Sequence, residues 1–190
     1  MKRLNIISIF AACVLALPVA ADSYRGVPGS SVKIAGTSTV HDWVVDSQLI
    51  GGSMELNGDL AKPGKVDAKA KALISVRSLK SGKKAMDDVM HAAMNETEHK
   101  RIEFNLKELI SEGDMKFKAT GDLTVSGVTK EVKFPVTMEK VDASAMNVKG
   151  ELDTKMSDFG IKSPSPKIAG GMIKTGDEVK ITFVWNTKKR

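Results

Sequence analysis

The sequence alternates apolar and polar side chains with a period of two, in one segment after another, from Val32 to the C-terminus. In the clearest segment, Val66 to Val76, every second residue is apolar, and Asp67, Lys69 and Lys71 stand between the apolar positions. Successive residues of a β-strand point to opposite faces of the sheet, so each such strand has one dry and one wet face. A chain with this pattern wraps sheet around an apolar interior.

The same pattern predicts a mainly β fold with about eight strands and one helix. Strands are expected within residues 32–35, 40–56, 66–76, 102–106, 115–125, 132–138, 146–152 and 179–185. Between the third and fourth of these, Met86, Met90 and Met94 follow the spacing of a short amphipathic helix. Because only one face of each strand is dry, a closed antiparallel barrel is favoured over a sandwich, and eight strands suffice to hold one ligand. Residues 23–30 are expected to be flexible.

The N-terminus has the features of a secretory signal peptide. Lys2 and Arg3 precede an apolar stretch, Ile6 to Leu17, and the small residues Val19-Ala20-Ala21 follow it. Cleavage after Ala21 divides the chain into a signal peptide, residues 1–21, and a single domain, residues 22–190, that is exported. Lipid attachment at Cys13 is the less favoured alternative, because Phe10 is a poor residue for such a site.

Composition narrows the partners of the exported domain. Cys13 is the only cysteine, so the mature chain would have no disulfide and would depend on packing for its stability. The formal net charge of +6 becomes +4 once Lys2 and Arg3 are removed. The surplus lysines are spread over alternate strand positions, which argues against nucleic acid. Transient contact with a membrane surface and a homodimer both remain open.

Four motifs occur in a fixed order along the chain: Gly36 to Trp43 (GTSTVHDW), the lysine-rich segment Ser78 to Met94, Gly121 to Lys130 (GDLTVSGVTK), and Ser157 to Ile161 (SDFGI). With these motifs the chain resembles the YceI-like polyisoprenoid-binding family over nearly its whole mature length. The resemblance implies an extended, lipocalin-like antiparallel barrel in the bacterial periplasm, with an elongated apolar cavity that holds a long isoprenoid or similar lipid. Compared with many members, this chain has more Ala and Met than Phe at inward positions.

The candidate site is the apolar interior of the barrel. Three alanines in a row on one dry face, Ala68, Ala70 and Ala72, would fill a core poorly unless a ligand occupies the space. The methionines of the helix could form a deformable lid or simply pack, and Trp43 could stack on a ligand near the opening. The predicted cavity-lining residues are Trp43, Val66, Ala68, Ala70, Ala72, Ile74, Met86, Met90, Met94, Phe104, Phe117, Leu123, Val136, Val148, Phe159 and Phe183.

The predicted function is therefore binding, transport or storage of a long apolar lipid, with no cofactor, no metal and no catalysis. The alternative is a stress or interaction protein whose barrel fills itself and whose surface engages a membrane or redox partner. A metal site or an enzyme would have to use His91 or His99, whose spacing does not match the H-E-x-x-H pattern. Either the methionine helix or the loop at residues 163–171 could gate the cavity.

Overall fold

The computed structural model describes residues 21–168 and 171–190, so all but the last residue of the expected signal peptide lies outside the described part. The elements, in chain order, are β1(Asp22–Gly26), β2(Ser31–Ser38), β3(Trp43–Ser47), β4(Gly51–Asn57), β5(Gly64–Ser75), the 3₁₀ turn η1(Val76–Ser78), α1(Lys84–Ala93), β6(Arg101–Gly113), β7(Lys116–Val125), β8(Val128–Lys140), β9(Ala145–Lys155), the 3₁₀ turn η2(Met156–Phe159), β10(Lys167–Ile168), β11(Gly171–Met172) and β12(Thr175–Lys189).

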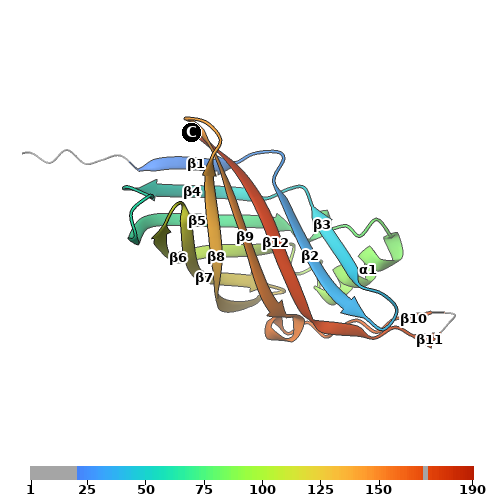
Figure 1. The fold of residues 1–190 in the computed structure, drawn as a ribbon. Helices are drawn as coiled ribbons and strands as arrows, with labels where there is room; N and C mark the ends of the chain where they lie inside the picture. Colours follow the sequence, from blue (N-terminus) through green and yellow to red (C-terminus); the bar gives the residue numbers. More distant parts are fainter. Residues whose placement is uncertain (1–20, 169–170) are drawn as a thin grey trace, which may run out of the picture.

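Eight of these strands close into an antiparallel barrel, which confirms the predicted fold class (Figure 1). Around the barrel the order is β1-β4-β5-β6-β7-β8-β9-β12, and β1 pairs with both β4 and β12 to close the ring. β2 pairs with residues 175–184 of β12, beyond the end of β1, and β3 continues the sheet beside β2. The wall is therefore longer on this side, and the barrel is elongated.

The N-terminal segment corrects one prediction from the sequence. Residues 23–26, part of the segment expected to be flexible, belong to β1, and Tyr24 is only 4 % exposed. Its neighbours across the sheet are Met54 and Lys189. The short segment has too few residues to show a periodic pattern, but it supplies the ladder that closes the barrel.

The strand-like stretch at residues 40–56, in which Gly51-Gly52 is expected to supply a bend, contains two strands, β3 and β4, separated by residues 48–50. Gly52 has a φ of +122°, and a Cβ at this position would collide with the carbonyl oxygen of Lys71 on β5. Only glycine tolerates both conditions, so Gly52 is required at the start of β4, where the chain joins the barrel beside β5.

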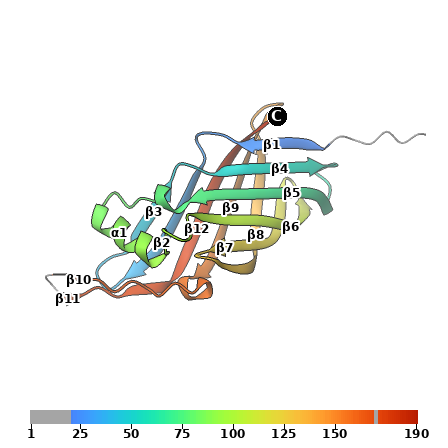
Figure 2. The same cartoon turned by 180° about the vertical axis from the view of Figure 1, so that it is seen from behind.

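Helix α1 lies across one end of the barrel, next to β3 and the β10–β11 hairpin (Figure 2). The buried Asp87 fixes its first turn by accepting hydrogen bonds from the backbone N–H and the Oγ of Ser81, both at 2.7 Å. Burial acts to raise the pKa of Asp87, but these hydrogen bonds and the Lys80 ammonium at 3.8 Å outweigh it and lower the pKa. Within the described residues, no helix is both long and apolar enough to cross a membrane.

The opposite end of the barrel is filled by its own side chains. Phe117 and Met146 are each 1 % exposed, and they belong to the same buried cluster as Tyr24 and Val66. This end therefore needs no ligand to complete its packing.

An apolar cavity as the candidate functional site

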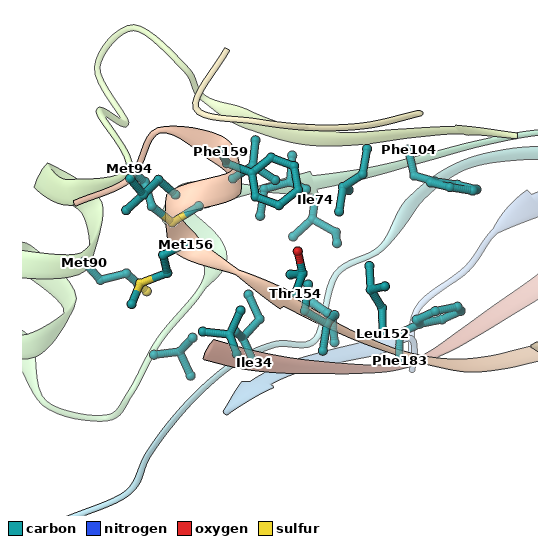
Figure 3. Close-up of a pocket in the computed structure, with 18 of the residues that line it drawn as sticks. Ile34, Ile74, Met90, Met94, Phe104, Leu152, Thr154, Met156, Phe159 and Phe183 are labelled. Atoms are coloured by element: carbon teal, nitrogen blue, oxygen red, sulfur yellow. The ribbon is translucent and has the colours of Figure 1, made fainter. Parts of the chain in front are cut away.

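The half of the barrel nearer α1 is hollow. It contains a cavity of about 720 Å³ lined almost entirely by apolar side chains (Figure 3). Every barrel strand except β1 contributes, and so do β2, β3, α1 and η2. The cavity stops at the packed end of the barrel described above, so it is closed at that end.

The exposure of the inward-facing residues shows that this space is open. Phe104, Leu152 and Ile34 line the cavity, yet they are only partly buried. Phe117, on the same side of the wall but in the filled end, is almost completely buried. Inward residues in a filled barrel would all resemble Phe117. The partly exposed ones therefore border free space, although other lining residues such as Val45 and Leu109 are as buried as Phe117.

Three glycines of the wall keep this space open, because a large aromatic ring lies over each of them. A Cβ on Gly121 would lie 2.5 Å from the Phe104 ring, and a Cβ on Gly150 would lie 2.6 Å from the Phe183 ring. Gly36 holds the indole of Trp43 in the same way. Each ring lies flat over the glycine of the neighbouring strand, as in cross-strand pairing of aromatic residues with glycine. The ring therefore takes up less of the space inside the barrel.

Three phenylalanines that line the cavity pack against one another. The ring of Phe134 on β8 lies 5.3 Å from that of Phe104 on β6 and 6.0 Å from that of Phe183 on β12, measured between centroids. Tilted and edge-on contacts of this kind are the preferred aromatic geometry. The three strands are thereby connected through side chains across the interior.

Methionines and a phenylalanine cover the end of the cavity next to α1. Met90 and Met94 point inward from the α1 side, and Met156 and Phe159 approach from η2 (Figure 3). Unbranched methionine side chains adapt to ligands of irregular shape. The two elements therefore form an adaptable apolar cover rather than a rigid plug.

Most of the polar residues that line the cavity lie around this opening, and Thr154 adds a hydroxyl farther along the β9 wall (Figure 3). Ser38, His41, Lys83, Lys155 and Lys167 line it at the opening. Within this rim, the indole N–H of Trp43 donates a hydrogen bond of 3.0 Å to the carbonyl oxygen of Thr37, which fixes its ring. The cavity therefore combines an apolar interior with a rim that is rich in cations, which suits a ligand with a long apolar chain and one polar end.

The lining predicted from the sequence lies along this cavity with three exceptions. Val66, Ala68 and Phe117 do not line it. They have the same inward alternation but lie nearer the filled end, where their neighbours occupy the space. Contact of the other predicted residues with a ligand stays a prediction.

Sequence reasoning missed the residues that shape the cavity. Gly36, Gly121 and Gly150 occupy strand interiors, and such glycines signal a close approach of another group. The loop at 163–171 was expected as a possible gate: its Pro164, Pro166 and Lys167 line the opening, and residues 169–170 lie outside the described part.

The histidines lie apart from one another. His91 Nε2 is 3.1 Å from the carbonyl oxygen of Leu79, and the His99 ring packs against Gly127. Among residues 21–168 and 171–190, no three His, Cys, Asp or Glu side chains gather in a way that could hold a metal ion.

Comparisons with known proteins agree with this architecture. The model of the YceI-like domain matches residues 28–186. No curated protein matches the sequence. Among solved structures, BcnA of Burkholderia cenocepacia is 21 % identical with a TM-score of 0.66, over 83 % of this chain and 95 % of that one.

Two further structures share the fold at lower identity. A polyisoprenoid-binding domain from Saccharophagus degradans is 14 % identical, with a TM-score of 0.69 over 88 % of this chain and 98 % of that one. The YceI protein of Campylobacter jejuni is 14 % identical, with a TM-score of 0.57 over 100 % of this chain and 99 % of that one. At these identities the likeness concerns the fold.

Proposed function

Because the chain belongs to the YceI-like family, we propose that it is an exported carrier that holds a long apolar lipid of the isoprenoid class in its barrel, without catalysing a reaction. The observation that carries the proposal is the cavity of about 720 Å³, which is lined mainly by apolar side chains and has its lysines at the opening. The name of the Saccharophagus domain, a polyisoprenoid-binding domain, supports the ligand class.

The volume sets the length of chain that the cavity holds. A water-sized group takes about 30 Å³, so about 720 Å³ accommodates about 24 groups of that size. The four isoprene units and hydroxyl of geranylgeraniol fit within this limit. At about 0.3 kcal/mol per non-hydrogen atom, a ligand that fills the space binds with a Kd in the low micromolar range.

The rim determines the orientation of the ligand. The apolar chain enters toward the filled end, and the polar end stays beside Lys83, Lys155 and Lys167, where water and positive charge are available. His41, exposed and with its Nδ1 2.7 Å from the carbonyl oxygen of Asp42, adds a further polar group at this rim. A hydroxyl, phenol or phosphate at the end of the chain satisfies this arrangement.

Export to the periplasm is the second part of the proposal. It is supported by the sequence of residues 1–21, with its basic start, apolar stretch and small-residue end. In that compartment a soluble barrel would shield an isoprenoid from water between membranes. Secretion of the full chain by a Gram-negative host, followed by N-terminal sequencing, tests cleavage after Ala21.

Lipid binding itself is tested by thermal unfolding with geranylgeraniol. A ligand present at 100 times its Kd stabilises the native state by about 2.7 kcal/mol, which raises Tm by about 5–10 °C for a chain of this size. Glycerol at the same concentration is the control, because it carries hydroxyls but no apolar chain. An unchanged Tm with geranylgeraniol, and no lipid in the mass spectrum of gently purified protein, would refute the proposal.

A further inference from the structure

β8 and β9 are paired over only part of their length. Their ladder joins Val136–Lys140 to Gly150–Met146 and stops there, although β8 starts at Val128 and β9 continues to Lys155. Figures 1 and 2 show the two strands together at one end and apart toward η2. The unpaired segments, residues 128–135 of β8 and 151–155 of β9, are called the seam below.

The seam is a gap between two strands, each of which is paired with another strand on its other side. On its outer sides, β8 pairs with β7 from Val128 to Thr137, and β9 pairs with β12 from Ala145 to Lys155. Within the described residues, no backbone pairing, hydrogen bond or ion pair joins one side of the seam to the other. Both strands are therefore ordered, but nothing polar ties them together across the seam.

Two residues mark where the ladder stops. Pro135 has no N–H to donate, so it cannot continue a regular ladder in both directions. A Cβ on Gly150, the last paired residue of β9, would lie 3.0 Å from the Pro135 carbonyl oxygen and 2.6 Å from the Phe183 ring. The chains thus approach closely at the end of the ladder and separate directly after it.

The far end of the seam is bounded by η2. This turn contacts β8, β9 and β12, and a Cβ on Gly160 would lie 3.6 Å from Val128 Cγ2. Between the ladder and η2, the five seam residues of β9 span about 17 Å at about 3.4 Å each. The seam is therefore a window of limited length in the wall. η2 lies between it and the opening under α1, and Lys155 borders both.

The apolar cavity reaches this window from inside, and a second hollow reaches it from outside. Val132 of β8 and Leu152 and Thr154 of β9 line both spaces. On the outer side, the second hollow is lined by charged residues of both signs, among them Lys133 and Asp153. The inner edges of the window are thus formed by Val132, Leu152 and one hydroxyl, that of Thr154, and the outer surface is charged.

We propose that the seam is a second, lateral opening of the lipid cavity, through which the part of an isoprenoid chain that exceeds the cavity passes between β8 and β9 to the outer face. The inference rests on the proposed lipid binding. A chain of about 24 water-sized groups fills the cavity, so a longer isoprenoid must leave it somewhere. The window offers an apolar edge on both strands and requires no ladder hydrogen bond to be broken.

A cross-link across the seam tests this route. If the register of Val136 opposite Gly150 continued, Lys133 would stand opposite Asp153. The double variant Lys133→Cys/Asp153→Cys, in a Cys13→Ser background and bridged by a short bis-maleimide, closes the window. The matched control, Thr137→Cys/Lys149→Cys, bridges two residues that are already paired.

The probes are geranylgeraniol, which fits the cavity, and solanesol, whose nine isoprene units do not. Closing the seam is expected to weaken solanesol binding about tenfold or more, the effect of losing about two buried carbon groups. Geranylgeraniol binding should stay within about twofold, and the control bridge should affect neither. Unchanged solanesol binding with the seam bridged would overturn the proposal while leaving lipid binding intact.

A photo-cross-link supplies a readout that does not depend on bridging. A benzophenone amino acid at the exposed position of Lys133 should capture bound solanesol but not geranylgeraniol, and the same group at Lys149 should capture neither. Capture of solanesol only by a benzophenone in place of Lys83, at the other opening, would overturn the lateral route. Absence of any binding of either alcohol to the wild-type protein would overturn the proposed function, and the seam proposal with it.

Discussion

The double variant Ala70→Leu/Ala72→Leu shortens the longest lipid that the cavity accepts. Both alanines line the cavity from β5. Each substitution adds three carbon groups, so six groups of about 30 Å³ remove about 180 Å³, a quarter of the volume. The capacity then falls from about 24 groups to about 18. Geranylgeraniol no longer fits, whereas farnesol, with three isoprene units, still does.

The assay is calorimetric titration with the two alcohols. The Kd for geranylgeraniol is expected to rise about tenfold or more, and the Kd for farnesol to change by less than about twofold. The matched control is Ala68→Leu, on the same face of β5 but away from the cavity lining. At position 68 the larger side chain meets packed neighbours, so the free energy of unfolding should fall by about 1–3 kcal/mol. The ratio of the two Kd values should stay unchanged.

Stability separates the two positions independently. Leucine at 70 and 72 enters empty space and should leave the free energy of unfolding of the unliganded protein unchanged or higher, whereas leucine at 68 should lower it. Urea unfolding measures both effects. Equal losses of affinity for farnesol and geranylgeraniol in the double variant, or destabilisation equal to that of Ala68→Leu, would refute the reasoning from cavity volume.

Three other perturbations probe the structure. Gly150→Ala places a Cβ 2.6 Å from the Phe183 ring, so the free energy of unfolding in urea should fall by about 1–3 kcal/mol. The double variant Gly150→Ala/Phe183→Leu should recover part of this loss. An unchanged free energy of unfolding would contradict the placement of the ring. Because its pKa is lowered in the fold, the stabilisation from Asp87 is present above the unfolded pKa of about 3.9 and lost as pH falls through the lower folded value. The variant Asp87→Ala should therefore have a lower Tm than the wild type near neutral pH, and this difference should shrink in acid. A difference that does not change with pH would contradict the stabilising role of the Asp87 carboxylate. Trp43 is partly exposed at the rim while Trp185 is only 4 % exposed, so the blue shift of tryptophan emission on binding geranylgeraniol should disappear in Trp43→Phe.

The sequence by itself determined the class of fold and the inward face of most strands. The alternation at residues 66–76 predicts the dry face of β5, and the spacing of Met86, Met90 and Met94 predicts α1. These are local signals with periods of 2 and 3.6 residues, so they can be read along the chain without knowing which strands meet. The four motifs additionally identified the family that the domain model later matched.

The tertiary structure alone decided where the barrel is hollow. Ala68 and Ala72 have the same inward position in the pattern, yet only Ala72 lines the cavity, because the volume at each level depends on side chains from all strands at that level. Closure by β1 and the seam between β8 and β9 also depend on pairing between segments distant in sequence. Periodicity specifies which way a side chain points, whereas free volume and unpaired edges arise only when the strands are assembled.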